Sequence, residues 1–225
     1  LSCSILVLIY FIGKHLFQER VGLMSAAIVM FYGVFVFYSG LLLKVTLSLF
    51  FSCLLILLLL RASRIPSQGI FFTAGLCLGS NILLRGNLLL LVPTILFWLF
   101  YFSPSKGSKM KQSLAFLLGV ALLVAPVTVR NYYLEQDFVL TTYDAGPSFY
   151  IGNHSGATGF QSHLPFVRPN PEFEESDFCM EAERRSGTTL KPSQVSLFWF
   201  EQSFQFFQDD PILFLKLFAK KFLLF

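Results

Sequence analysis

The stretch LAFLLGVALLVAPVTVRNYY, residues 114–133, decides the fold class. From Leu114 to about Thr128 it is apolar on every side and offers no polar face at helical spacing. A core helix of a soluble bundle keeps such a polar face, whereas a membrane span does not. We therefore predict that this segment crosses a membrane and that the chain enters water at Arg130.

Similar apolar runs, separated by short basic connectors, fill the chain before this stretch. We expect about six spans in residues 1–129, at residues 1–17, 21–39, 41–60, 69–84, 88–102 and 114–128. About 20 residues cross the hydrocarbon as a helix, and the polar flanks of the three shorter runs can complete them at the interface. Gly75 and Gly79 form a small-xxx-small pair, which predicts close helix packing.

Composition agrees with this interpretation. The chain is 55% hydrophobic and 13% charged, with a mean hydropathy of +0.66, whereas soluble domains carry about 25% charged residues. The net charge of +4 does not indicate nucleic-acid binding, because the basic residues stand at the ends of apolar runs and form no stripe. The cysteines suggest neither a disulfide framework nor a metal site.

The basic residues also predict the orientation. Alternating spans place seven of them on one side of the membrane and three on the other. The first side holds Lys14, Arg20, Arg61, Arg64, Lys106, Lys109 and Lys111, and the second holds Lys44, Arg85 and Arg130. By the positive-inside rule the first side is cytoplasmic. The region after Arg130 should then lie outside the cytoplasm.

Residues 130–210 read as an extracytoplasmic loop domain, with twelve acidic and five basic residues. We expect a short strand at 139–142 and helices at 173–185 and 192–207. The fold class is thus an all-α polytopic integral membrane protein with a small mixed extracytoplasmic domain. The aromatic residues of the second helix suit a domain core, with the membrane interface as the alternative. The acidic run at 172–183 fits a solvated helix face better than a metal or catalytic site.

Residues 211–225 read as an interfacial helix. Asp209 and Asp210 precede Pro211, which is the usual pattern of a helix start and fits a cap better than a metal site. Lys216 and Lys220 share one face of an otherwise apolar helix, as in helices that lie on a membrane surface. Because the chain begins and ends inside apolar runs, we interpret it as a fragment whose next span follows residue 225.

Two stretches carry a family resemblance. In the first, Arg85 and Asn87 precede a run of leucines and Pro93. In the second, residues 126–132 read PVTVRNY and residues 150–159 read YIGNHSGATG. These stretches resemble the GT-C superfamily of membrane glycosyltransferases, especially bacterial family 39 proteins related to dolichyl-phosphate-mannose protein mannosyltransferases and to the lipid A aminoarabinose transferase.

The resemblance implies an enzyme of a bacterial inner membrane that takes a sugar from a polyprenyl-phosphate carrier. A glycan, lipid or protein outside the cytoplasm would accept the sugar. Arg85 is the first candidate for the lipid phosphate, because guanidinium pairs with phosphate in bidentate fashion. Simple anchoring at the interface is the equal alternative. Arg130, which also fits a topology-setting charge, and Lys44 are weaker candidates.

The second stretch supplies candidates for the sugar or acceptor site. They are Tyr150, Gly152, Asn153 and Gly156, and a tight structural turn explains them at least as well. The catalytic residue is unknown, since the family's acidic base lies in a loop that would precede Leu1. No cofactor is assigned, and dependence on a divalent metal stays open.

Two departures from the family pattern leave an inactive or divergent member as an alternative. Val45 stands where the family often has Glu, and Gly86 stands where it often has Pro.

Two other functional classes remain. A transporter or flippase would show charges or proline breaks near span centres and an internal repeat. A noncatalytic scaffold would tolerate neutralisation of Arg85.

Overall fold

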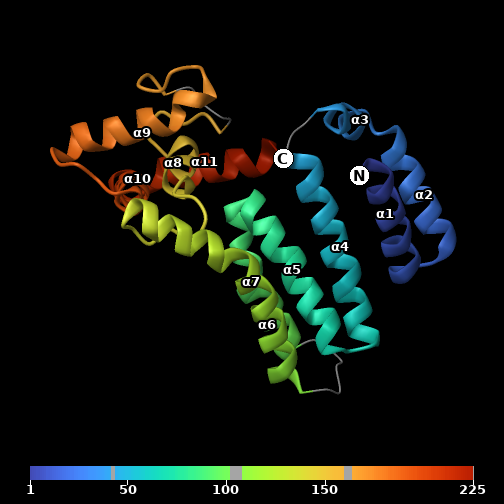
Figure 1. Cartoon of the computed structure of the whole chain (residues 1–225). Helices are drawn as coiled ribbons and strands as arrows, with labels where there is room; N and C mark the ends of the chain where they lie inside the picture. The colour runs from blue at the N-terminus through green and yellow to red at the C-terminus, as the bar shows by residue number, and fades with distance from the viewer. Residues whose placement is uncertain (42–43, 102–107, 160–163, 225) are drawn as a thin grey trace. The chain divides into compact units, whose positions relative to one another are not determined.

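The computed structural model describes residues 1–41, 44–101, 108–159 and 164–224, and these residues contain helices but no strand (Figure 1). The contacts divide the chain into two compact units, Leu1–Val127 and Thr128–Phe225. Phe102, at a predicted span end, and Lys106, in a predicted connector, lie outside the described residues.

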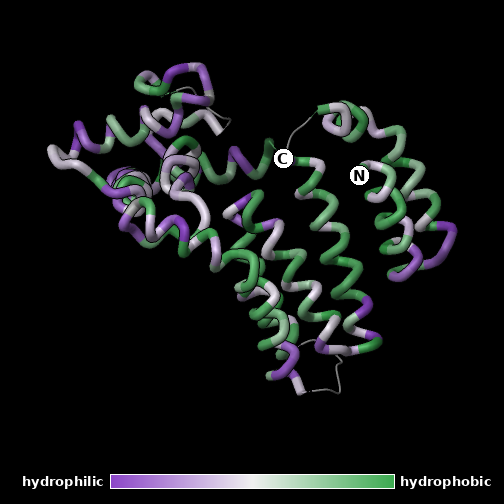
Figure 2. The backbone as a smooth tube through the Cα atoms, viewed as in Figure 1, coloured by the Kyte–Doolittle hydropathy of each residue, from purple (hydrophilic) through white to green (hydrophobic). Residues whose placement is uncertain are grey.

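The first unit consists of the apolar runs, each folded as a helix (Figure 2). In chain order they are α1 (Ser2–Leu16), α2 (Glu19–Phe31), α3 (Gly33–Gly40), α4 (Lys44–Arg64), α5 (Gln68–Leu84), the 3-10 helix η1 (Gly86–Leu90), α6 (Leu91–Tyr101) and α7 (Lys109–Glu135), of which the last continues into the second unit. The expected span at 21–39 is bent by 62° between α2 and α3. The bend falls at Tyr32, whose backbone is extended, just before Gly33.

Length separates these helices into two groups. α4 and residues Lys109–Leu134 are long and apolar enough to cross a membrane, and the bent pair α2 and α3 would make a third span. The shorter apolar helices are Ser2–Leu16, Gln68–Leu84 and Gly86–Tyr101. At about 1.5 Å per residue, the 17 residues of α5 cover only about 26 Å. The class of all-α membrane protein is confirmed, while six spans stay a prediction.

The exposed side chains of α7 indicate that its surroundings are apolar. Phe116, Val120 and Val124 are buried and join the core of the first unit. Leu114, Leu118 and Leu122, spaced one helical turn apart, are 57%, 55% and 59% exposed. A stripe of leucines facing water would be costly, whereas the same stripe facing lipid is favourable.

Glycines bring α5 and α7 together. A Cβ added to Gly75 would stand 2.1 Å from the carbonyl oxygen of Phe116, and one added to Gly119 would stand 2.3 Å from the oxygen of Phe72. Gly79 meets Val120 and Leu123 one turn further on. The two helices therefore run parallel in close contact, and the packing expected for Gly75 and Gly79 is confirmed.

In its described residues, the second unit holds the end of α7 and four further helices. They are α8 (Ala145–Gly152), α9 (Pro171–Ser186), α10 (Pro192–Asp209) and α11 (Pro211–Leu224). The helices expected at 173–185 and 192–207 are confirmed. Asn170 caps α9, since its side chain accepts a hydrogen bond from the Glu172 N–H at 3.1 Å.

The strand expected at 139–142 was wrong, because α7 side chains bind that backbone instead of a partner strand. Thr128 Oγ1 donates to the Leu140 carbonyl at 2.9 Å. Asn131 Nδ2 lies 3.2 Å from the carbonyl oxygens of both Val139 and Thr141. The β-branched residues Val139, Thr141 and Thr142 are typical of a strand, but the backbone carbonyls of this segment accept hydrogen bonds from α7.

Trp199 is the centre of the second unit. Its side chain is fully buried, and its indole N–H donates to the Phe178 carbonyl at 3.1 Å. Phe166 stacks on it with ring centroids 5.4 Å apart. The aromatic face of α10 thus serves as a domain core, as expected, although Phe204 and Phe207 remain 56% and 42% exposed.

Candidate functional site

The open end of the α4–α5 hairpin brings two of the candidate phosphate ligands to one place. α4 and α5 pack along their lengths and are joined by residues 65–67, so the start of α4 and the end of α5 lie together. Lys44 is the first residue of α4, and Arg85 directly follows α5. Both are exposed, and neither side chain makes a hydrogen bond or ion pair with a residue that the structure describes.

The Arg85 backbone forms the hinge between α5 and η1. Its conformation is extended, with φ −144° and ψ 100°, while its N–H still donates to the Asn81 carbonyl at 2.8 Å. The Arg85 carbonyl in turn accepts from the Leu88 N–H at 3.1 Å. The backbone is therefore fixed on both sides, and the guanidinium is left available for an anion.

Asn81, one turn before Arg85, ties α5 to α4. The residue is 1% exposed. Its Oδ1 accepts from the Ser48 hydroxyl at 2.7 Å, and its Nδ2 donates to Ser52 Oγ at 2.8 Å. Hydrogen bonds of this kind join helices in lipid, where no water competes. Sequence reasoning missed Asn81, although an asparagine deep in an apolar run was a signal.

Arg130 belongs to the second unit, on the exposed side of α7. Its side chain has no hydrogen bond or ion pair with any residue in the described ranges. The neighbouring Asn131 has a structural role, since it holds the loop after α7 as described above.

The four sugar-site or acceptor-site candidates lie together at the end of α8. The Tyr150 ring packs 4.5 Å from Trp199 and is stacked on His154 at 5.3 Å, measured between ring centroids. Gly152 ends α8, and Asn153 follows it. The Gly156 N–H donates to His154 Nδ1 at 3.1 Å, which closes the turn.

Lys221 of α11 holds this turn, and sequence reasoning missed it because it lies 68 residues from Asn153. Its ammonium donates to the Gly152 carbonyl at 2.5 Å and to Asn153 Oδ1 at 2.9 Å. Asn153 Nδ2 donates to the Phe149 carbonyl at 2.8 Å. The amide of Asn153 still has one N–H and one lone pair for another partner.

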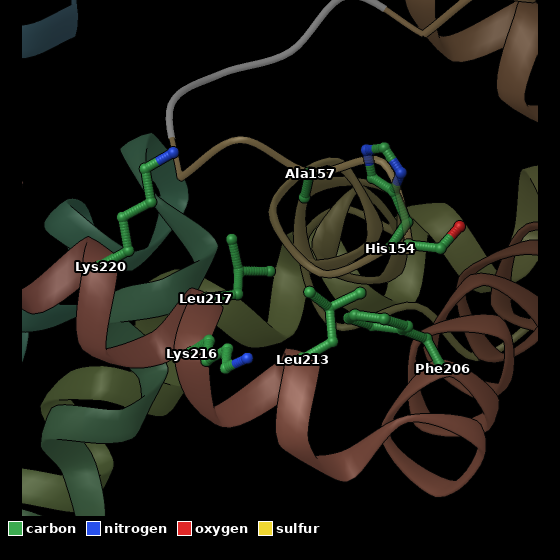
Figure 3. Close-up of a pocket in the computed structure, with 8 residues that line it drawn as sticks. His154, Ala157, Phe206, Leu213, Lys216, Leu217 and Lys220 are labelled. Carbon is green, nitrogen blue, oxygen red and sulfur yellow. The ribbon is translucent and has the colours of Figure 1, made fainter.

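A pocket of about 170 Å³ lies between this turn and α11 (Figure 3). His154, Ser155 and Ala157 line it from the turn, and Leu213, Lys216, Leu217 and Lys220 line it from α11, with Phe206 from α10. Burial and the nearby charge of Lys221 lower the pKa of His154, so its imidazole is neutral at pH 7.

The acidic run differs in part from the solvated face expected of it. Asp177 is buried and forms a bidentate pair with Arg168, at 2.6 Å for the shortest contact. Glu181 pairs with both Arg184 and Arg185, and its side chain is 11% exposed. The hydroxyl of Tyr143 donates to Glu175, and Glu183 accepts from the Leu190 N–H at 3.0 Å. Within the described ranges, the side chains of Glu172 and Glu174 make no hydrogen bond or ion pair. Glu175, Asp177 and Glu183 therefore tie α9 to residues outside the helix, whereas Glu181 pairs within it.

Within the described ranges no three His, Cys, Asp or Glu side chains are grouped so that they could hold a metal ion. Asp210, the other metal alternative, is a helix cap. Its Oδ1 accepts from the Leu213 N–H at 2.9 Å, at the start of α11. The capping expectation is confirmed for Asp210, whereas Asp209 is the last residue of α10.

An apolar helical unit with basic residues at its ends, followed by a polar helical unit, defines an integral membrane protein. The family model described as dolichyl-phosphate-mannose-protein mannosyltransferase matches residues 1–132. The match covers more than half of the chain, and the chain belongs to this family. Membership implies glycosyltransfer from a polyprenyl-phosphate sugar donor. No curated protein and no solved structure matches the chain.

The matched residues include Lys44, Arg85 and Arg130, whereas Tyr150–Gly159 lies beyond them. The family assignment therefore rests on the first unit and the start of the second. The roles suggested for the α8 turn rest on the sequence resemblance and on its local geometry.

Proposed function

We propose that this protein transfers a sugar from a polyprenyl-phosphate donor to an acceptor at the extracytoplasmic face of a bacterial inner membrane. Family membership supports the donor class. The observation that carries the proposal is the hairpin end, where Lys44 and Arg85 stand at the ends of two apolar helices, exposed and without a partner among the described residues. A polyprenyl tail suits the hydrocarbon beside such helices, and its phosphate suits the cations at their end.

The chemistry assigned to Arg85 is phosphate binding and charge stabilisation. Guanidinium forms paired hydrogen bonds with phosphate oxygens, and these bonds strengthen where water is scarce. When the bond between sugar and phosphate breaks, the phosphate keeps the bonding electrons and gains negative charge. A fixed guanidinium stabilises that charge more in the transition state than in the bound donor. Lys44 adds a second positive charge at the same end.

The proposal is tested by sugar transfer with the full-length protein in lipid nanodiscs. The donors are polyprenyl phosphates carrying labelled sugars, beginning with mannose, and the acceptors are membrane glycans, lipids and proteins. We expect wild-type transfer, and a fall of at least about tenfold in Arg85→Ala, because a lost charge-assisted contact costs about 1.5–3 kcal/mol. Arg85→Lys should recover part of the activity.

Arg61→Ala is the matched control, since Arg61 is an exposed arginine of α4 at the opposite end of the same hairpin. An equal loss of sugar transfer in both variants would show that the effect is not specific to Arg85. That result would rule out the proposed binding of the donor phosphate by Arg85. Full transfer by Arg85→Ala would favour the noncatalytic scaffold or an unrelated donor site.

A further inference from the structure

α11 contacts the segment Tyr150–Gly159 at several points. Lys221 binds Gly152 and Asn153 through the two hydrogen bonds given above. Gly159 has a φ of 91°, a conformation that favours glycine, and its Cβ position lies 3.2 Å from Leu224 Cδ1. The turn after α8 is therefore shaped against one face of α11.

Lys221 is an unusual residue for this position. Its two acceptors are uncharged oxygens, and no acidic side chain in the described part of the chain forms an ion pair with it. Burial lowers the pKa of its ammonium. The carbonyl end of a helix favours a cation, and Gly152 supplies that carbonyl as the last residue of α8. The ammonium thus acts as a cap on α8 supplied by a distant helix.

We propose that Lys221 is a positioning residue, which fixes Gly152 and Asn153 and so sets the geometry in which Tyr150–Gly159 meets the sugar or acceptor. This inference rests on the proposed function. Lys221 does not touch the reacting atoms in this account. It orients Asn153, whose remaining N–H and lone pair are the groups offered to a ligand.

The test compares Lys221→Met and Lys221→Arg in the full-length protein. Methionine fills a similar volume without a donor, whereas arginine can donate to both oxygens. We expect Lys221→Met to lower transfer about tenfold or more and to speed hydrogen exchange in residues 150–159, with an unchanged melting temperature. Lys221→Arg should restore most of the sugar transfer and most of the protection of residues 150–159 from hydrogen exchange. Lys111→Met is the control, because Lys111 is an exposed lysine of α7 that does not line the pocket and whose side chain makes no hydrogen bond or ion pair with any described residue.

If Lys221→Met transfers sugar and exchanges hydrogen at the same rates as the wild type, the inference is overturned. Faster exchange throughout α10 and α11 with a lower melting temperature would overturn it as well, since that result indicates general support of the unit. The two proposals fail separately. If the wild type transfers no sugar, the proposed function fails, while exchange in residues 150–159 still decides whether Lys221 orders the turn.

Discussion

Single side chains cap helix ends in the second unit. Asp210 is one example, because its carboxylate satisfies a backbone N–H that α11 would otherwise leave unpaired. Asp137 is another. Its carboxylate accepts from the Ser193 N–H at 2.7 Å and from the Ser193 hydroxyl at 2.8 Å, at the start of α10. Each cap comes from a residue outside the helix that it completes.

The Asp210 cap is tested by Asp210→Ala. The variant should lose about 1 kcal/mol of stability and show faster hydrogen exchange in the first turn of α11, because Leu213 loses its acceptor. Asp209→Ala is the matched control, since Asp209 makes no side-chain hydrogen bond within the described ranges. Equal exchange in the two variants would refute the cap.

Glu181 makes a pH-dependent contribution to stability. Hydrogen bonds from Arg184 lower its pKa from 4.5 to about 2, with a further contribution from Arg185. The unfolded state therefore takes up the proton first as the pH falls. The stabilisation is complete above about pH 4.5 and is lost between there and about pH 2.

Thermal unfolding of wild type and Glu181→Gln across this range measures the effect. The difference in melting temperature should be largest above pH 4.5 and should shrink as the pH falls towards 2. A difference that stays constant over the whole range would mean that the ionised carboxylate is not what stabilises α9.

At the scale of elements, helix packing in the first unit depends on small residues. Gly75→Ala should separate α5 from α7, because the new Cβ would stand 2.1 Å from the Phe116 carbonyl oxygen. We expect a loss of about 1–3 kcal/mol, seen as a lower melting temperature in detergent or nanodiscs. In Gly69→Ala the nearest atom would be Ser67 Oγ at 3.6 Å, so this control on the same helix should remain stable.

The Asn81 network is a second device at this scale. Asn81→Leu keeps the side-chain volume but removes both bonds to α4, and should cost about 0.6–2 kcal/mol. Ser80→Ala is the control, since among the described residues the Ser80 hydroxyl bonds only the Leu76 carbonyl of its own helix. Arg85 follows Asn81 by one helical turn, so loosening the contact between α5 and α4 should weaken donor binding as well as packing. If Asn81→Leu keeps both wild-type stability and wild-type donor binding, the network contributes to neither.

Most elements could be predicted from the sequence, because apolar period, caps and proline positions are local signals. The bend at Tyr32 and the helical turn at 145–152 were not predicted, and the strand at 139–142 was wrong. The helix α8 depends on packing against α10, and the backbone of residues 139–141 depends on side chains of α7, and neither contact shows in a local pattern. The same reason explains which residues of the candidate site could be predicted. Arg85 and Tyr150–Gly159 could be named from motifs, whereas Asn81 and Lys221 are recognisable only by their partners.

Across the whole molecule, an extracytoplasmic transfer site requires that the hairpin end with Arg85 face away from the cytoplasm. The distribution of basic residues predicts this orientation. Cysteine substitution at Asn87, beside Arg85, should be labelled by a membrane-impermeant maleimide in intact cells. Cysteine at Ser67, in the turn at the other end of the hairpin, should react only after the membrane is opened.

The most direct test of the central claim is the binding of a polyprenyl phosphate to the full-length protein in nanodiscs. We expect saturable binding by the wild type and by Arg61→Ala, with affinity lowered about tenfold or more in Arg85→Ala. High salt should weaken wild-type binding as well, because the contact is ionic. Equal affinity in the wild type and Arg85→Ala would contradict the account.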